Sequence, residues 1–216
     1  MAIRPRILIT AGPTREMLDP VRFLSNLSTG EMGYQLAHAA VRKGWEVTLV
    51  SGPTALLSPT GVRLVSVITA KEMEQAVKTH FKKNDALIMT AAVCDYTPVH
   101  RSAQKIKRIH QRSVKFKRTS DILKAVAKNK DGRYVIGFCL ETENLEKNAI
   151  RKLREKNLDL IVANSYGSGR NPFGHREVSV LLIDKFLVKK PLSKYSKKKL
   201  ANYLLTLLAR NLKSRD

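Results

Sequence analysis

The segment 12–33 constrains the fold of this chain more than any other part of the sequence. An apolar run at 6–10, rich in β-branched residues, predicts a buried strand before it, and the pattern at 34–43 predicts a helix that Gly44 ends. Strand-to-helix connections in α/β proteins usually take about 2–6 residues, and this one takes roughly 20. We therefore interpret the segment as functional.

The same segment is rich in groups that bind anions, and a Ser-Thr-Gly turn opens the helix. The free N–H groups and positive dipole end of a helix N-terminus attract phosphate. We predict a phosphate or substrate-binding loop here, with a phosphate-bearing ligand. Its candidate residues are Gly12, Thr14, Arg15, Arg22, Ser28, Thr29 and Gly30.

Strand and helix patterns alternate along the rest of the chain. This order predicts an α/β fold with a Rossmann-like, doubly wound, mostly parallel sheet. Strands are expected at 46–51, 63–68, 85–90, 134–138 and 159–164, and helices at 70–83, 120–130 and 142–157. Thr69 is the expected N-cap of the second helix, with Glu72 completing a capping box. A hairpin is expected from 178–184 and 186–190, and a last amphipathic helix from Ser193 to Leu212.

The alternation breaks at a strongly basic stretch. No acidic residue lies between Tyr96 and Ser120, and V-K-F-K-R at 114–118 fits a half-exposed strand. We predict a basic flap or small antiparallel subdomain at roughly 97–118, inserted in a single domain that spans residues 1–216.

Composition limits the partners. The formal net charge of +22 favours nucleotides, acidic substrates, nucleic acid or an anionic membrane surface, without choosing among them. Cys94 and Cys139 lie far apart, which suits a reducing compartment. We expect a cytoplasmic protein, because the sequence has no signal-peptide core and no apolar run long enough for a membrane span. Side-chain spacing predicts no metal site.

The chemistry of an open parallel sheet lies beyond the carboxyl ends of its strands. The candidate segments at that edge are the loop after Thr10, residues 91–96, residues 137–142 and the residues from Asn164 onward. No G-x-G-x-x-G, Walker A or G-x-S-x-G motif occurs, and the second strand ends in Ser51-Gly52 rather than in an acid. With these motifs excluded, the remaining interpretation is a phosphate chemistry carried out by lysines, side-chain amides and backbone N–H donors.

Five motifs extend over nearly the whole chain. They are I-T-A-G-P-T-R-E-x-L-D-P-V-R-F-L-S-N-x-S-T-G-x-M-G at 9–33, A-A-V-x-D-Y at 91–96, K-I-K-R at 105–108, G-F-x-x-E-T at 137–142 and K-x-x-x-K-N-L-D-L-I-V-A-N at 152–164. Together they resemble the phosphopantothenate–cysteine ligases (phosphopantothenoylcysteine synthetases) of coenzyme A biosynthesis. In many bacteria this domain is fused behind a flavin-dependent decarboxylase; this chain resembles the stand-alone form.

The resemblance, which favours the bacterial, CTP-using type over an ATP-using one, implies that 4′-phosphopantothenate attacks CTP to give an acyl-cytidylate that L-cysteine converts into the amide. It also implies Mg²⁺ with the triphosphate, a homodimer formed with help of the flap, and a possible separate phosphopantothenoylcysteine decarboxylase as partner. The implied catalytic residues are Asn26 and Lys105. The implied nucleotide-binding residues are Met89, Thr90, Ala91, Asp95, Lys105, Ser120, Asp121, Ile122, Leu123, Phe138, Lys152 and Lys156.

Simpler interpretations exist for several of these residues. Asn26 could be a turn residue, and Lys105 one lysine of a solvated run. Lys152 and Lys156, four residues apart, are expected on one side of a helix, where they repel each other unless an anion lies between them. Cys94 and Cys139 stand where the family usually has alanine, and packing explains them better than catalysis.

Two other function classes stay open. A Rossmann-like polyanion or nucleic-acid binder would explain the charge, but the flap has one Phe and no Trp for stacking on bases, so we expect no nucleic-acid partner. The second open class is a nucleotide-sugar-dependent or NAD-dependent enzyme. Part of the charge is expected to be solubilising surface, as in the late run Lys189, Lys190, Lys194, Lys197, Lys198 and Lys199.

Overall fold

A computed structural model of the chain describes residues 4–107, 113–167, 171–174 and 176–213. The flap residues Arg108 and Arg112 and part of the Gly-rich loop after Asn164 lie outside the described residues. Within the described residues, no helix has the length and apolar character needed to cross a membrane.

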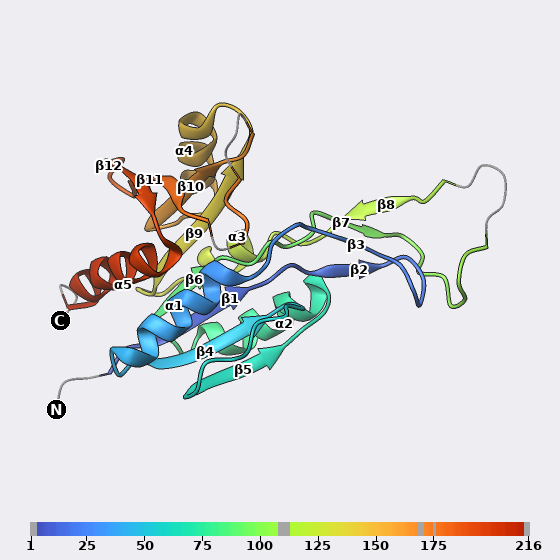
Figure 1. Cartoon of the computed structure of the whole chain (residues 1–216), viewed down its shortest axis with the longest axis horizontal. Helices are drawn as coiled ribbons and strands as arrows, with labels where there is room; N and C mark the ends of the chain where they lie inside the picture. Colours follow the sequence, from blue (N-terminus) through green and yellow to red (C-terminus); the bar gives the residue numbers. More distant parts are fainter. Residues whose placement is uncertain (1–3, 108–112, 168–170, 175, 214–216) are drawn as a thin grey trace.

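The centre of the fold is one eight-stranded sheet in the order β12-β11-β10-β9-β6-β1-β4-β5 (Figure 1). From β10 to β5 neighbouring strands are parallel, and β11 and β12 add an antiparallel edge. The strand bounds are β1 Arg6–Ala11, β4 Glu46–Ser51, β5 Val62–Ser66, β6 Ala86–Met89, β9 Tyr134–Glu141, β10 Leu160–Ser165, β11 Val178–Asp184 and β12 Lys189–Tyr195. The predicted fold class, a Rossmann-like and mostly parallel α/β sheet, is confirmed.

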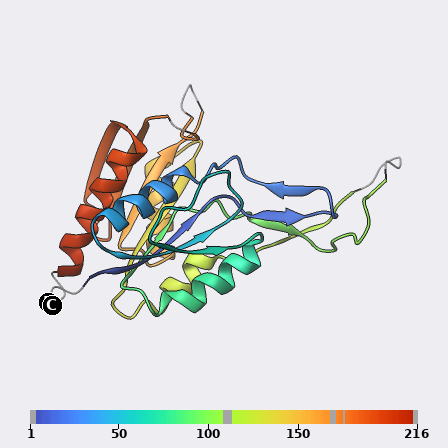
Figure 2. The same ribbon diagram turned by 60° about the horizontal axis from the view of Figure 1, so that its bottom comes forward.

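Helices cover both faces of the sheet (Figure 2). Because successive side chains of a strand point to opposite faces, Ile7 and Ile9 pack with α1 and α5, and Leu8 packs with α2, α3 and α4. The helix bounds are α1 Glu31–Arg42, α2 Ala70–Phe81, α3 Ile122–Ala127, α4 Leu145–Glu155 and α5 Lys197–Lys213.

Several predicted boundaries were wrong. Ser193 does not cap the last helix, because it lies within β12; Ser196 Oγ accepts the Lys199 N–H instead, at 3.2 Å. The second hairpin strand starts only at Lys189, because the Asp184 carboxylate binds the N–H groups of Phe186 and Val188 and so makes the turn longer. The helix α3 is shorter than predicted, since Asp131 and Gly132 adopt positive φ shortly after it.

The capping box of α2 is present in a modified form. Thr69 Oγ1 accepts the Glu72 N–H at 3.2 Å, as predicted. The Glu72 carboxylate, however, accepts the N–H of Ile68 at 2.7 Å, one residue before the N-cap.

Two antiparallel pairs form an arm that projects from the sheet (Figure 1). The predicted antiparallel subdomain is confirmed as the pair β7 Tyr96–Pro98 and β8 Phe116–Arg118. A second pair was not predicted: β2 Arg15–Met17 and β3 Phe23–Ser25 lie within the long connection 12–33. A Ser102 N–H bond to the Leu18 carbonyl at 3.0 Å joins the two parts of the arm.

The carboxylate of Asp19 is the main polar tie within the arm. It accepts the N–H groups of Val21 and Arg22, the Arg22 guanidinium at 2.6 Å and the N–H of Ile106 at 3.1 Å. The bond from Arg22 and then those from the backbone hold the pKa of Asp19 far below its usual range, although burial opposes the shift. Ionised Asp19 thus links the first hairpin to the flap.

We predict that Asp19→Asn loosens the arm, since the amide keeps the shape but loses the charge and part of the accepting capacity. Amide hydrogen exchange at 18–25 and 102–107 should become about tenfold faster in Asp19→Asn, and that in β1 should not change. Because the folded pKa is lowered, the stabilisation is complete above the ordinary pKa of an aspartate and is lost as the pH falls below about 4. The matched control is Asp131→Asn, whose carboxylate is 67% exposed; equal effects of both changes would contradict the prediction.

Candidate active site

Two adjacent hollows open at the carboxyl edge of the sheet. The strand order reverses between β1 and β6, and ligands of doubly wound sheets bind at such a point. The first hollow has about 490 Å³ and the second about 570 Å³. A common wall separates them, made of Ala91, Val93, Asp95 and Phe138.

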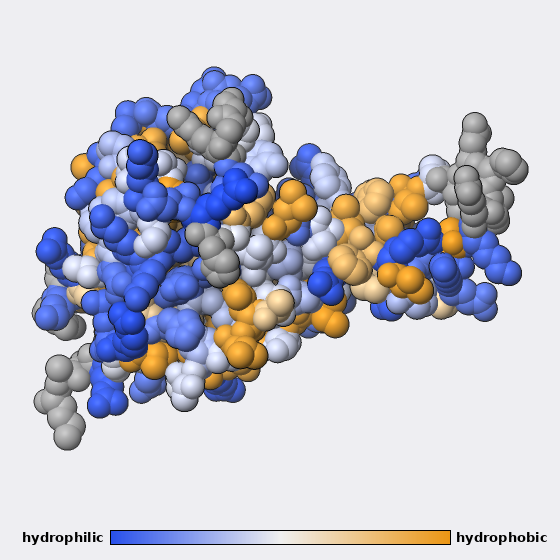
Figure 3. Space-filling view, in the orientation of Figure 1, coloured by the Kyte–Doolittle hydropathy of each residue, from blue (hydrophilic) through white to orange (hydrophobic). Residues whose placement is uncertain are grey.

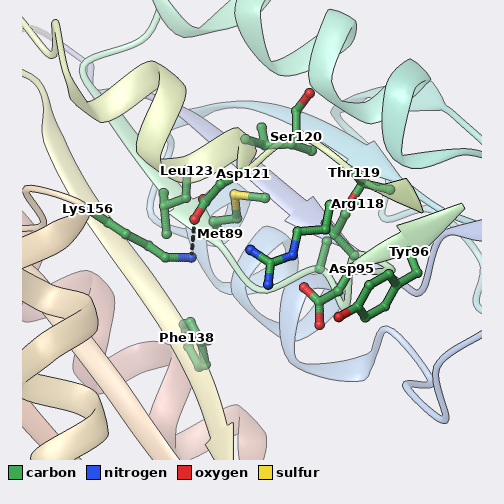
Figure 4. A pocket seen from close by; sticks show the side chains of 13 residues that line it. Met89, Asp95, Tyr96, Arg118, Thr119, Ser120, Asp121, Leu123, Phe138 and Lys156 are labelled. Carbon is green, nitrogen blue, oxygen red and sulfur yellow. Dashed lines mark ion pairs between the residues drawn. The ribbon is translucent and has the colours of Figure 1, made fainter. Parts of the chain in front are cut away.

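The first hollow lies between the end of β6, the root of the arm and the start of α3 (Figure 4). The Arg118 guanidinium points into it, and Lys156 Nζ forms an ion pair with Asp121 at 2.9 Å on the opposite side (Figure 4). The other Asp121 oxygen accepts the Lys124 N–H at 3.0 Å and thereby caps α3. The hollow therefore presents two cations and a helix start.

Most of the residues predicted to bind a nucleotide meet in this first hollow. It is lined by Met89, Ala91, Asp95, Ser120, Asp121, Ile122, Leu123, Phe138 and Lys156. Thr90 and Lys152 line the second hollow instead.

The expectation that Lys152 and Lys156 share one side of a helix was wrong, because the two side chains face different hollows. The helix α4 ends at Glu155, and Lys156 is its C-cap residue. Lys152 Nζ forms an ion pair with Glu141 at 2.6 Å, and Lys156 pairs with Asp121. Each lysine thus has its own carboxylate and faces its own hollow.

The second hollow contains Asn26 and the start of α1. Asn26 Nδ2 donates to the Ala92 carbonyl at 2.9 Å and lies 3.8 Å from Cys94 Sγ, which fixes the orientation of the amide. Ser28, Thr29 and Gly30 of the predicted substrate-binding loop line the same hollow, and their role in binding stays a prediction. Gly30 has φ +81°, and a Cβ there would lie 2.8 Å from Thr54, so the turn requires glycine.

The other residues of that predicted loop have structural contacts and do not line either hollow. The Thr14 hydroxyl accepts the Cys94 N–H at 2.9 Å, and the Arg15 guanidinium lies over the Phe23 ring. Arg22 binds Asp19 and the carbonyl of Ile106, and Gly12 packs against the backbone of Gly52. Their role in binding phosphate stays a prediction.

Lys105 lies exposed on the arm and lines neither hollow. Its predicted catalytic role stays a prediction.

The sequence analysis placed the segment 137–142 just past the end of a strand, but most of it lies within β9. The strand β9 continues to Glu141, because its backbone pairs with β10 as far as Ser165. Phe138, Cys139 and Leu140 therefore line the second hollow from within a strand.

Both cysteines are near the site and both thiols are protonated at neutral pH. Burial raises the pKa of Cys94, whose Sγ also contacts the Thr14 carbonyl at 3.4 Å. Burial raises the pKa of Cys139 to about 11. Because the thiolate is the nucleophile, neither side chain fits a covalent role.

The sequence analysis left several residues of the site unassigned, among them four with large or polar side chains. Arg118 and Thr119 line the first hollow, and Tyr166 and Phe173 line the second. Arg118 was visible only as one of many flap cations, and its position next to the Ser120 helix start was the available signal. Among the described residues, no group of three or more His, Cys, Asp or Glu side chains is placed to hold a metal ion.

Comparison with known proteins agrees with this geometry. The family of the DNA/pantothenate metabolism flavoprotein C-terminal domain matches residues 3–212. The chain belongs to this family. The family resemblance inferred from the motifs is therefore confirmed.

Relatives support the assignment. The coenzyme A biosynthesis bifunctional protein CoaBC of Bacillus subtilis (strain 168) is 45% identical over 170 residues, which are 78% of this chain and 42% of that protein. The solved C-terminal domain of a CoaBC protein is 41% identical, with a TM-score of 0.83 over 97% of this chain and 96% of that one. A mutant of Cab2 in complex with phosphopantothenate-cysteine shares the fold, with a TM-score of 0.76 at 16% identity over 97% of this chain and 87% of that one.

The chain spans less than half of the length of the bifunctional curated relative. The stand-alone form suggested by the sequence therefore stays a prediction.

We predict slow alkylation of Cys139 by iodoacetamide at pH 7.5, because its raised pKa leaves little thiolate. The rate should rise about tenfold for each pH unit between 7.5 and 9.5. N-acetylcysteine under the same conditions is the control, and its rate should level off near its own lower pKa. Labelling of Cys139 at pH 7.5 as fast as that of the free thiol would contradict the prediction.

Proposed function

We propose that this protein is a phosphopantothenate–cysteine ligase of coenzyme A biosynthesis that uses CTP. The observation that carries the proposal is the pair of hollows with shared lining residues, one that holds Arg118 and Lys156 beside the carboxylates of Asp95 and Asp121, and one at the start of α1. Two anionic substrates placed in them would meet at Ala91 and Asp95. Membership of the family supports the same reaction class.

In this proposal CTP occupies the first hollow and 4′-phosphopantothenate the second. Arg118, Lys156 and the start of α3 face the triphosphate, and Phe138 packs near the base. The carboxylate of phosphopantothenate attacks the α-phosphorus, and pyrophosphate leaves with the electrons of the broken P–O bond. Fixed cations stabilise the negative charge of this transition state.

The amine of cysteine then attacks the carbonyl of the acyl-cytidylate. The amide bond forms, CMP leaves, and the amine loses a proton. The Asn26 amide, held by Ala92 and Cys94, is the group proposed to bind the oxygen that gains charge. Mg²⁺ would enter as part of the CTP substrate, with the Asp95 and Asp121 carboxylates in the first hollow as candidate outer partners.

The reaction itself is tested by pyrophosphate release from CTP and from ATP, with and without phosphopantothenate and cysteine. The proposal requires release that depends on phosphopantothenate, prefers CTP and is followed by amide formation. A protein that releases no pyrophosphate but binds DNA in a salt-dependent manner would belong to the polyanion-binding class instead.

We predict that Asn26→Asp accumulates the acyl-cytidylate, since a carboxylate repels the developing oxyanion of the second step. Quenched reactions analysed by mass spectrometry should contain the intermediate in this variant. The control is Asn202→Asp in α5, which lines neither of the two hollows and should react like the wild type. Normal product formation by Asn26→Asp would remove Asn26 from the mechanism.

We predict that Arg118→Gln raises the KM for CTP about tenfold or more, because it removes a cation that points into the first hollow. The neighbouring Lys117→Gln is the matched control, since successive residues of β8 point to opposite sides. Steady-state kinetics with saturating phosphopantothenate measure both. Equal KM values for the two variants would exclude Arg118 from nucleotide binding.

We further propose that the arm forms a homodimer. Large apolar side chains gather along it, where Figure 3 shows a cluster next to basic residues. The exposed apolar residues of the arm and its root are Val21, Phe23, Leu24, Leu27, Tyr96, Val99, Val114 and Phe116. An apolar surface of this kind on a projecting element marks a protein interface.

Phe116→Asp should shift the protein from dimer to monomer in light scattering after gel filtration, because the carboxylate would be buried at the interface. Phe186→Asp, at a residue 76% exposed in the β11–β12 turn, is the control and should leave the mass unchanged. A monomeric wild-type protein at micromolar concentration would contradict the proposal.

A further inference from the structure

Lys197, the first residue of α5, is the exception in a run of surface lysines. It is only 7% exposed, whereas Lys198 and Lys199 are exposed. Its Nζ donates a hydrogen bond to the carbonyl oxygen of Gly174, and its side chain lines the second hollow. The sequence pattern alone placed it with the solubilising charges.

A buried ammonium group is unfavourable unless polar partners replace water. Burial lowers the pKa of Lys197, and the negative charge of Glu31, the buried first residue of α1, opposes that shift. The starts of α1 and α5 thus place a carboxylate and an ammonium group below the same hollow. Because burial of the ammonium group is unfavourable, we infer that its contact with Gly174 has a structural role.

The contact fixes a short segment that builds one wall of the second hollow. Pro172 and Phe173, just before Gly174, line it. The Phe173 ring packs on Tyr166 with the ring centroids 5.9 Å apart, and the Tyr166 N–H binds the Glu141 carbonyl at the end of β9. The wall is therefore held at two points, by β9 through Tyr166 and by α5 through Lys197.

The wall is apolar, which sets the part of a substrate that it can contact. With Phe173 and Tyr166, the side chains of Leu140, Val180 and Leu200 give the second hollow an apolar part of its lining. Phosphopantothenate has a phosphate at one end and a carboxylate at the other; between them lie a hydroxyl group, an amide and a gem-dimethyl group, and this last group is its apolar, branched body. That body matches this part of the lining.

We propose that Lys197 is a positioning residue that holds the Phe173 wall in place and thereby sets the affinity for the acid substrate, not for the nucleotide. The inference rests on the proposed function for the identity of that substrate. Lys197 does not line the first hollow. Of the two hollows, Phe173 and Pro172 line only the second.

Lys197→Met keeps the aliphatic stem and removes the donor to Gly174. The KM for phosphopantothenate should rise about tenfold, and the KM for CTP should stay within about twofold of the wild-type value. Lys197→Arg, which retains N–H donors, should recover most of the loss. Lys198→Met, an exposed neighbour, is the matched control. An equal rise of both KM values, or no rise, would overturn the inference.

A double-mutant cycle tests whether Lys197 changes the KM for phosphopantothenate through Phe173. If Lys197 acts through the wall, Phe173→Ala should raise the KM for phosphopantothenate much less in Lys197→Met than in the wild type. Independent, additive effects would overturn the inference.

Hydrogen exchange gives a readout that needs no catalysis. Amides at 171–174 should exchange faster in Lys197→Met than in Lys198→Met, with β1 and α2 unchanged in both. Unchanged exchange at 171–174 would overturn the positioning role. Absence of ligase activity in the wild type would instead refute the proposed function, and the exchange result would still decide whether Lys197 holds the wall.

Discussion

The site depends on the central position of β1 in the parallel sheet. Ile7, Leu8 and Ile9 have no exposed surface, and burial of each such side chain stabilises the fold by about 1.5–3 kcal/mol. With β4 on one side and β6 on the other, the chain after β1 must leave the sheet at the edge where the strand order reverses. The long connection, the end of β6 and the end of β9 therefore meet there.

A compact set of hydrogen bonds then joins the arm to this edge. The buried Thr14 donates its N–H to the Ala92 carbonyl at 3.2 Å and accepts the Cys94 N–H, while the Thr119 hydroxyl donates to the Cys94 carbonyl at 2.6 Å. Both ends of the flap and the root of the first hairpin thus share one anchor. The same anchor orients Asn26, since Ala92 and Cys94 also hold its amide.

The sequence predicted the elements whose pattern is regular and local. Buried strands and amphipathic helices fall close to their predicted places, and most predicted nucleotide residues line one hollow. The hairpin β2–β3 was missed because its strands have three residues each and leave Phe23 and Leu24 exposed, so no alternation marks them. The separate roles of Lys152 and Lys156 depend on Glu141 and Asp121, which come from other elements. Burial of Lys197 depends on Gly174 in the same way.

Ala91, Val93, Asp95 and Phe138 line both hollows, which limits how the site can change. Ala91 borders both spaces, so a larger residue there would take volume from each of them at once. A change that adapts one hollow to a different molecule would alter the fit of the other. Selectivity at the two hollows is therefore coupled by geometry, and adaptation of either needs compensating changes on its outer side.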